Sequence, residues 1–163
     1  MTFPVTRMRR LRANETIRSM VRETQLNLKD LIYPLFITLG QDIRNPVQSM
    51  PGVFQLSVDN LPKEIKAINS LGIPAVLLFG IPDCKDNLAS GAYDRDGVVQ
   101  QGIRTIKDTC PDLLIITDVC LCEYMDHGHC GIVDADGTIK NDESLDLLAR
   151  EAFSHVEAGA DMV

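Results

Sequence analysis

The segment Thr117–Gly131 holds the residues of this chain that are best suited to chemistry. Three cysteines in it, Cys120, Cys122 and Cys130, form a C-x-C-x7-C pattern within 11 residues. Thiolates are strong ligands for zinc, and three of them can occupy three of the four tetrahedral positions around the ion. The fourth position is then open to water or substrate, which is the arrangement of a catalytic zinc rather than a structural one.

Other interpretations of this segment are weaker but stay open. Two cysteines that are two residues apart on a strand point to the same face, so buried strand cysteines without a metal are the simplest alternative. A zinc ribbon normally needs two C-x2-C pairs, and the sequence has none. A redox sensor needs exposed thiols of low pKa, which a sequence cannot show. Asp118, Asp126, His127 and His129 lie between or beside the cysteines.

The remaining cysteines and the third histidine are not predicted to belong to this cluster. Cys84 is distant in the sequence, and Cys110 continues an apolar helical stripe, which indicates a core position. His155 falls in a predicted helix, where a surface or packing role is more common than metal binding. Disulfides are rare in a reducing compartment, so clustered cysteines there are more often metal ligands or catalytic groups.

The elements that must position these residues alternate between strands and helices. Continuous apolar runs are typical of strands buried on both faces, as in parallel sheets. The predicted strands are 31–37, 75–81 and 113–119, with the start of a fourth at Ala160–Val163. Apolar residues at helical spacing predict helices over 61–71, 99–110 and 145–156, and a short helix after Asn14. Gly72 and Gly159 are predicted helix ends, and Asn141 or Asp142 a predicted cap.

Strands that alternate with helices predict right-handed βαβ units, a parallel sheet and the α/β fold class. Two connections, 38–60 and 82–97, are long and follow the carboxyl ends of strands, where such folds place active sites. They are interpreted equally well as functional loops or as surface insertions. The 163 residues are too few for a complete (β/α)8 barrel of about 250. Because the chain stops as the fourth strand starts, we expect a fragment of a longer protein rather than an open sheet.

The composition indicates a globular protein with an acidic balance. The chain has 16 Lys and Arg residues and 23 Asp and Glu residues, so its net charge is −7. This charge argues against a nucleic-acid partner, because phosphate neutralisation needs clustered basic residues. The one basic cluster is predicted to be a solvated arm or a subunit contact; it comprises Arg7, Arg9, Arg10 and Arg12. No apolar stretch approaches the roughly 18 residues of a membrane span, and no signal-peptide pattern is present. We therefore expect no membrane partner and a cytoplasmic location.

Taken together, these segments resemble the porphobilinogen synthase family, also called delta-aminolevulinic acid dehydratase. The resemblance covers nearly the whole chain and is carried by RMRRLR, VRETQL, DLIYPLF, MPGV, DRDGVV, TDVCLCEYMDHGHCGI and AGADMV. The cysteine-rich segment is similar to the family's zinc signature. Members that use magnesium carry aspartates or other residues in place of these cysteines, so the chain resembles the zinc-dependent, three-cysteine branch.

The resemblance implies a fold and an activity. The implied fold is the N-terminal half of a TIM-type (β/α)8 barrel over residues 31–163, preceded by an N-terminal arm over residues 1–30. In the family this arm embraces a neighbouring subunit of a homo-oligomer, commonly an octamer. The implied reaction condenses two molecules of 5-aminolevulinate into porphobilinogen with loss of two waters, in tetrapyrrole (haem) biosynthesis. The alternative is a non-catalytic zinc-binding or interaction module derived from that family.

The resemblance also implies roles for individual residues. Cys120, Cys122 and Cys130 are the implied zinc ligands, and Asp118 is an implied catalytic residue near the metal and substrate. His129 is implied to help a second metal site, for zinc or magnesium, in some members. Two family lysines form Schiff bases with the substrates, and no lysine here stands in that context. The chain's lysines are Lys29, Lys63, Lys66, Lys85, Lys107 and Lys140. By itself, the chain is therefore expected to be inactive.

Overall fold

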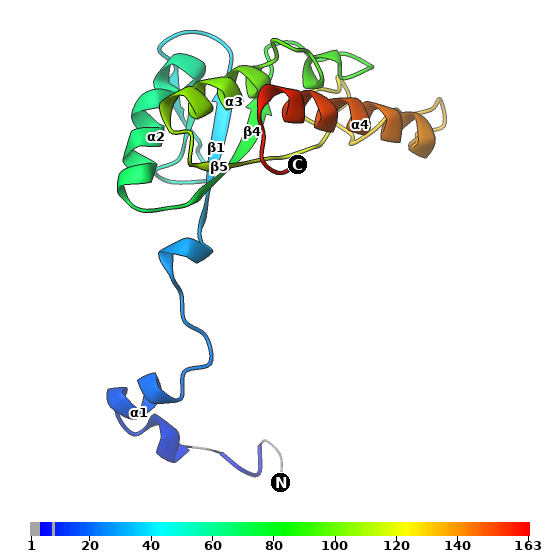
Figure 1. Ribbon diagram of the computed structural model, residues 1–163. Helices are drawn as coiled ribbons and strands as arrows, with labels where there is room; N and C mark the ends of the chain where they lie inside the picture. Colours follow the sequence, from blue (N-terminus) through cyan, green and yellow to red (C-terminus); the bar gives the residue numbers. More distant parts are fainter. Residues whose placement is uncertain (1–3, 8) are drawn as a thin grey trace. The chain divides into compact units, whose positions relative to one another are not determined.

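The computed structural model describes residues 4–7 and 9–163. They form two compact units, Met1–Asp30 and Leu31–Val163 (Figure 1), and each is described by itself. The first three residues and Met8 belong to the predicted arm but lie outside the described residues.

The first unit is built from short helical turns. Helix α1 (Glu15–Met20) begins after Asn14, whose side-chain oxygen accepts a hydrogen bond from the backbone N–H of Ile17 at 2.9 Å. This side chain satisfies one of the free N–H groups at the helix start, and the short helix predicted after Asn14 is confirmed. Two 3-10 turns flank it, η1 (Arg9–Arg12) and η2 (Leu28–Asp30).

The second unit is an α/β structure with one five-stranded sheet in the order β2-β3-β1-β4-β5. The strands are β1 (Ile32–Thr38), β2 (Arg44–Pro46), β3 (Phe54–Ser57), β4 (Ala75–Ile81) and β5 (Leu114–Thr117). The helices are α2 (Leu61–Ser70), α3 (Val98–Thr109) and α4 (Asn141–Ala158), with 3-10 turns η3 (Val58–Asn60) and η4 (Ser90–Ala92).

The three strands predicted from apolar runs are confirmed, and they are parallel to one another. β1 pairs with β4 along its whole length, from Ile32 opposite Ala75 to Thr38 opposite Ile81. β4 pairs in turn with β5, also in parallel. The start of the predicted fourth strand is present as a single parallel bridge between Ile116 and Met162. The α/β class with a parallel sheet is therefore confirmed.

The structure differs from the sequence prediction in three places. The long connection after β1 contains β2 and β3, which are too short to give a recognisable pattern; β3 is parallel to β1, and β2 is antiparallel to β3. β5 ends at Thr117 rather than 119, because the chain turns away there into the cysteine loop. The predicted N-cap of α4 is wrong, because Asn141 is already helical and Lys140 is the N-cap residue, whereas Gly159 ends the helix as predicted.

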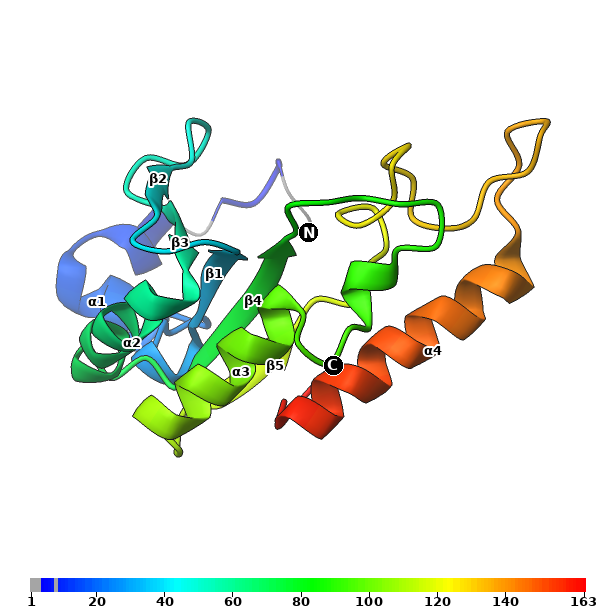
Figure 2. The same cartoon turned by 90° about the horizontal axis from the view of Figure 1, so that it is seen from above.

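The main core lies between the sheet and the helices, which cover one of its faces (Figures 1 and 2). Leu78 of β4 and Ile103 of α3 are fully buried in it. The opposite face is only half-buried, although it carries apolar residues such as Phe36 and Phe79, whose rings stack at 5.1 Å. The strands were expected to be buried on both faces. Only the face that the helices cover is fully buried.

A second, smaller core fixes the loop that follows β5. It contains Leu121, Tyr124 and Met125 of that loop, packed against Leu147 of α4 and Ala92 of η4. Among residues 4–7 and 9–163, no helix has the length and apolar character needed to cross a membrane.

Gly80 of β4 is the position where the two cores meet most closely. A Cβ atom there would overlap the hydroxyl of Tyr124 and lie 2.6 Å from Cγ2 of Val99. We expect Gly80→Ala to lower the free energy of unfolding by about 1–3 kcal/mol, because strand and loop must move apart. Urea unfolding measures this. Gly91→Ala is the control, since its Cβ would lie 3.4 Å from Cδ1 of Tyr124, an ordinary van der Waals contact; an equal loss in both variants would contradict the prediction.

Candidate metal centre

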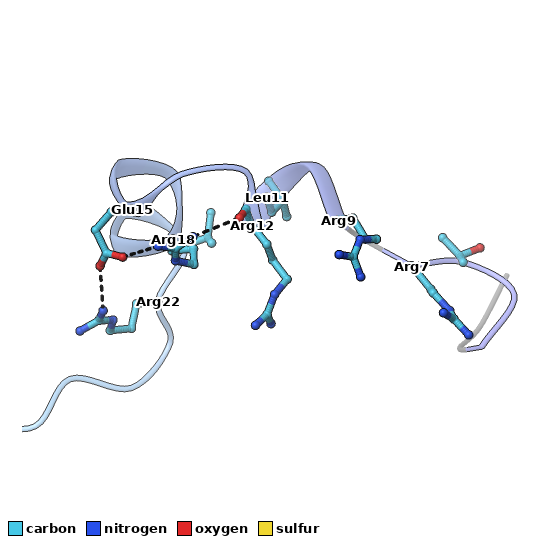
Figure 3. Close-up of a pocket in the computed structure, with 9 residues that line it drawn as sticks. Arg7, Arg9, Leu11, Arg12, Glu15, Arg18 and Arg22 are labelled. Atoms are coloured by element: carbon cyan, nitrogen blue, oxygen red, sulfur yellow. Dashed lines mark hydrogen bonds and ion pairs between the residues drawn. The ribbon is translucent and has the colours of Figure 1, made fainter.

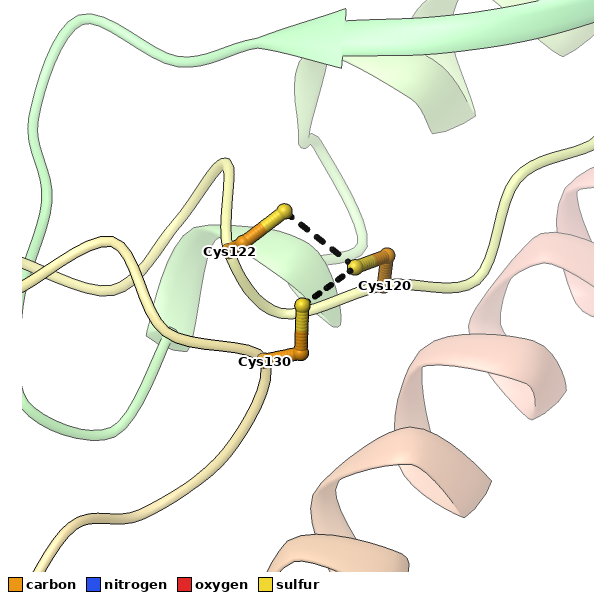
Figure 4. Close-up of side chains that lie close together, drawn as sticks. All are labelled: Cys120, Cys122 and Cys130. Carbon is orange, nitrogen blue, oxygen red and sulfur yellow. Dashed lines mark hydrogen bonds between the residues drawn. The ribbon is translucent and has the colours of Figure 1, made fainter. Parts of the chain in front are cut away.

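Three sulfur atoms converge in the loop that follows β5. The Sγ atom of Cys120 lies 3.2 Å from that of Cys122 and 3.4 Å from that of Cys130. Figure 4 shows the three side chains pointing toward one another. All three ligand atoms lie within 4.8 Å of one another, close enough to hold one metal ion.

The convergence depends on a turn and not on strand alternation. Cys120 and Cys122 lie beyond the end of β5, in irregular backbone. The chain then turns at Leu121, whose carbonyl accepts hydrogen bonds from the N–H groups of Tyr124 at 3.0 Å and Met125 at 2.9 Å. The same-face argument for a C-x-C pair on a strand therefore does not apply here.

The two long loops contact each other at this edge of the sheet. Asp86, in the connection after β4, forms a parallel bridge with Met125 of the cysteine loop. Its backbone N–H donates to the carbonyl of Tyr124 at 3.1 Å, and its carbonyl accepts from the N–H of Asp126 at 3.2 Å. The connection 82–97 thus packs against the cysteine loop.

The charges around the sulfurs favour a bound cation. Burial raises the pKa of Cys120, and burial followed by the contact with Glu123 raises the pKa of Cys122. The thiol of Cys122 lies 3.0 Å from Oε2 of Glu123. Burial, followed by the charge of Glu123, also raises the pKa of Asp118. A divalent cation would supply the positive charge that thiolates need here.

The sulfur positions fit a zinc-sized ion. Tetrahedral zinc with Zn–S bonds of about 2.3 Å separates its sulfurs by about 3.8 Å. The separations of 3.2 Å from Cys120 to Cys122 and 3.4 Å from Cys120 to Cys130 are a few tenths of an ångström shorter, so small side-chain rotations would open the triad enough for the ion. Soft thiolate donors favour zinc over magnesium, which prefers oxygen.

Two acidic residues of the loop, Asp118 and Glu123, lie next to this cluster. Asp118 lies close to it: its carboxylate, the sulfur of Cys120 and the carboxylate of Glu123 form a second group of ligand atoms within 4.8 Å of one another. Sequence reasoning did not single out Glu123, although its place directly after Cys122 is a signal. In the described part of the chain, no such group includes His127 or His129, whose exposed rings lie 5.4 Å apart.

Two buried polar residues of α4 lie beside the start of the cysteine loop. Glu151 is 1% exposed and His155 is 0% exposed. Burial raises the pKa of Glu151 to about 8 and lowers that of His155 to about 4. Nδ1 of His155 lies 3.0 Å from the hydroxyl of Thr117, at the end of β5. His155 was predicted to be a surface or packing residue, and its burial makes it a packing residue. Glu151 was missed because nothing local distinguishes it from an exposed helical glutamate.

The basic cluster of the N-terminal unit has a different character. Arg7, Arg9 and Arg12 are exposed and line a hollow in which Glu15 is the acidic residue (Figure 3). Glu15 forms ion pairs with Arg18 at 2.5 Å and Arg22 at 3.7 Å. Arg7, Arg9, Arg10 and Arg12 are exposed, which fits a solvated arm and a subunit contact equally well.

Comparison with known proteins identifies the family. The family profile described as "Delta-aminolevulinic acid dehydratase" matches residues 5–163. The chain belongs to the delta-aminolevulinic acid dehydratase family. The resemblance seen in the sequence motifs is therefore confirmed.

Individual members of the delta-aminolevulinic acid dehydratase family match over almost the whole chain. A relative from Halalkalibacterium halodurans is 55% identical over 157 residues, which are 96% of this chain and 48% of the relative. One from Synechococcus elongatus is 49% identical over 164 residues, 99% of this chain and 50% of that protein. The chain thus spans about half the length of the curated relatives it matches.

A solved family structure matches the fold. The Toxoplasma gondii delta-aminolevulinic acid dehydratase (porphobilinogen synthase), in complex with the reaction product porphobilinogen, superposes with a TM-score of 0.90 at 38% sequence identity. The match covers 97% of this chain and 46% of that one. The sheet and helices described above therefore correspond to about half of a porphobilinogen synthase chain.

The low pKa of His155 predicts a loss of stability in acid. Its unfolded pKa is about 6.5, so as the pH falls from 6.5 toward 4 the unfolded chain gains a proton that the folded chain does not. The free energy of unfolding should fall by about 1–3 kcal/mol over this range from His155 alone. The raised pKa of Glu151 acts with the opposite sign, so the quantity to measure is a difference between variants.

Urea unfolding of the wild type and His155→Gln, from pH 7 to pH 4 with a chelator present, measures that difference. We expect the variant to lose less stability in acid than the wild type. His127→Gln, at an exposed site, is the control and should follow the wild type. Parallel pH curves for the wild type and His155→Gln would contradict the assignment.

Proposed function

We propose that this chain provides the metal-binding part of an active site that condenses two molecules of 5-aminolevulinate into porphobilinogen with loss of two waters. The observation that carries the proposal is the convergence of three thiol groups at the carboxyl ends of parallel strands, in a member of the delta-aminolevulinic acid dehydratase family. Active sites of parallel α/β folds lie at these ends.

Cys120, Cys122 and Cys130 would hold a zinc ion, with the fourth tetrahedral position left for water or substrate. When bound, zinc supplies a Lewis acid that polarises a ketone carbonyl without proton transfer. The support for zinc is the soft, three-sulfur donor set and its spacing. Cys130 is exposed while Cys120 and Cys122 are half-buried, so a ligand could approach from the Cys130 side.

The residues of the chain itself would bind and orient the substrate. 5-Aminolevulinate carries an amino group that is cationic at neutral pH, and the carboxylates of Asp118 and Glu123 lie beside the sulfur of Cys120. We infer that Asp118 attracts and orients this amino group next to the metal position. The buried side chains of Leu121, Tyr124 and Met125 exclude water from beneath the site.

We also infer a homo-oligomeric assembly through the N-terminal arm, commonly an octamer in the family, and a cytoplasmic setting. The exposed arginines of the arm support a contact role. The free, clustered thiols support a reducing compartment. These inferences are independent of the metal chemistry.

The metal proposal predicts about one tightly bound zinc per chain. Cys122→Ser should weaken zinc binding at least about 100-fold, because it removes one of three charged ligands. Competition with a chromophoric chelator, under a reductant, measures the affinity. Cys84→Ser, at an exposed cysteine outside the cluster, is the matched control; an equal effect of both substitutions would contradict the assignment.

The enzymatic proposal is tested with a chimera in which this chain replaces the matching segment of the Halalkalibacterium halodurans relative. We expect the chimera to form the pyrrole product from 5-aminolevulinate and the isolated chain to form none, since its lysines lack the family's Schiff-base context. Cys122→Ser in the chimera should lower the rate at least about 100-fold, the scale of losing a Lewis acid worth several kcal/mol.

Each outcome of that experiment is decisive. A folded chimera that binds zinc but makes no pyrrole would favour the non-catalytic zinc-binding module. Turnover by the isolated chain would show that one of its own lysines forms the imine; Lys85, whose ammonium lies 3.5 Å from the carbonyl oxygen of Cys122, would be the first to substitute.

A further inference from the structure

One face of α4 follows the cysteine loop from end to end. Ser144, Leu147, Glu151 and His155 are buried and lie three or four residues apart, so they form a single stripe along the helix. Each contacts a different part of the loop, and the contacts run in reverse chain order. Figure 4 shows the pale red and orange helix beside the three cysteines.

At the N-terminal end of the stripe, Ser144 holds the backbone that follows Cys130. Its hydroxyl accepts a hydrogen bond from the N–H of Ile132 at 3.0 Å and donates one to the carbonyl of Lys140 at 2.6 Å. Gly131 fits against it so closely that an added Cβ would lie 2.6 Å from the hydroxyl oxygen. The position of Cys130 is therefore tied to Ser144.

At the other end, Glu151 and His155 hold the backbone that precedes the cluster. The carboxyl group of Glu151 is buried, and the backbone of Cys120 lowers its pKa against the larger, opposite effect of burial. One turn further along, His155 contacts the hydroxyl of Thr117 at 3.0 Å. Between the two ends, Leu147 packs in the same core as Leu121.

This buried stripe contains polar side chains that packing alone does not explain. Among the described residues, Oε2 of Glu151 and Nε2 of His155 have no hydrogen-bond partner, although both residues are fully buried. Unpaired buried polar atoms cost free energy, and an apolar side chain of similar size is often as stable or more so. A role for the Glu151 carboxyl group beyond packing accounts for its presence.

We propose that Ser144 and Glu151 are positioning residues of the metal centre: from the two ends of one helix stripe, they bring Cys130 and Cys120 within reach of a single ion. The proposal rests on the proposed three-cysteine metal site. In this proposal, side chains of α4 supply the outer hydrogen bonds that hold metal ligands in position.

The test compares three variants of the full chain by zinc competition and by cobalt substitution. Glu151→Leu removes the carboxyl group at similar volume, Glu151→Gln keeps a polar side chain of the same shape, and Glu157→Leu makes the same change at an exposed position of the same helix. We expect Glu151→Leu to weaken metal binding about 10-fold or more and to reduce the thiolate-to-cobalt charge-transfer band. Glu151→Gln should recover most of the loss, and Glu157→Leu should match the wild type.

The metal-free stability separates positioning from simple packing. We expect Glu151→Leu to leave the free energy of unfolding of the metal-free chain unchanged or higher, while metal affinity falls. A fall in both without recovery in Glu151→Gln, or affinity equal to that of Glu157→Leu, would overturn the proposal. Absence of zinc binding in the wild type would overturn the proposed metal site as well.

If Glu151→Leu fails to fold, as judged by circular dichroism, Ser144→Ala decides the question. It removes the hydroxyl that holds Ile132 and should also weaken metal binding about 10-fold or more. Unchanged affinity in a folded Ser144→Ala chain would overturn the proposal.

Discussion

Close approach of three thiol groups is the constraint on which the second unit of this chain depends. Cys120 and Cys130 are ten positions apart in the sequence, yet their sulfurs lie 3.4 Å apart. Ordering such a loop costs conformational entropy, and thiolates so close together repel one another unless a cation lies between them. Both ends of the loop must therefore be fixed, one by β5 and the other by α4, and a tight turn at Leu121 must shorten the path.

The parallel sheet explains why this loop meets the connection after β4. Parallel strands bring their carboxyl ends to one edge, so segments far apart in the sequence become neighbours there. The bridge between Asp86 and Met125 is the direct result. Gly80 leaves the space that the Tyr124 side chain fills, and this links the end of β4 to the loop after β5.

Helix α4 is unusual because its polarity is reversed over much of its length. Its buried side carries Ser144, Glu151 and His155, whereas Leu145 and Phe153 are 55% and 64% exposed on its outer side. A helix that packed only against a hydrophobic core would show the opposite pattern. The buried polar groups are accounted for by the loop backbone that they contact, and a row of exposed apolar residues is typical of a contact surface.

The sequence by itself determined the class of fold and the chemistry of the candidate site. Continuous apolar runs located β1, β4 and β5, and the C-x-C-x7-C pattern identified the three thiols, because both are local properties of the chain. The tertiary structure alone decided the rest. β2 and β3 are too short to show a period and form only because neighbouring backbone pairs with them. Glu151 is buried next to the loop by packing across the fold, and such packing depends on which distant segments a side chain meets, which local spacing does not encode.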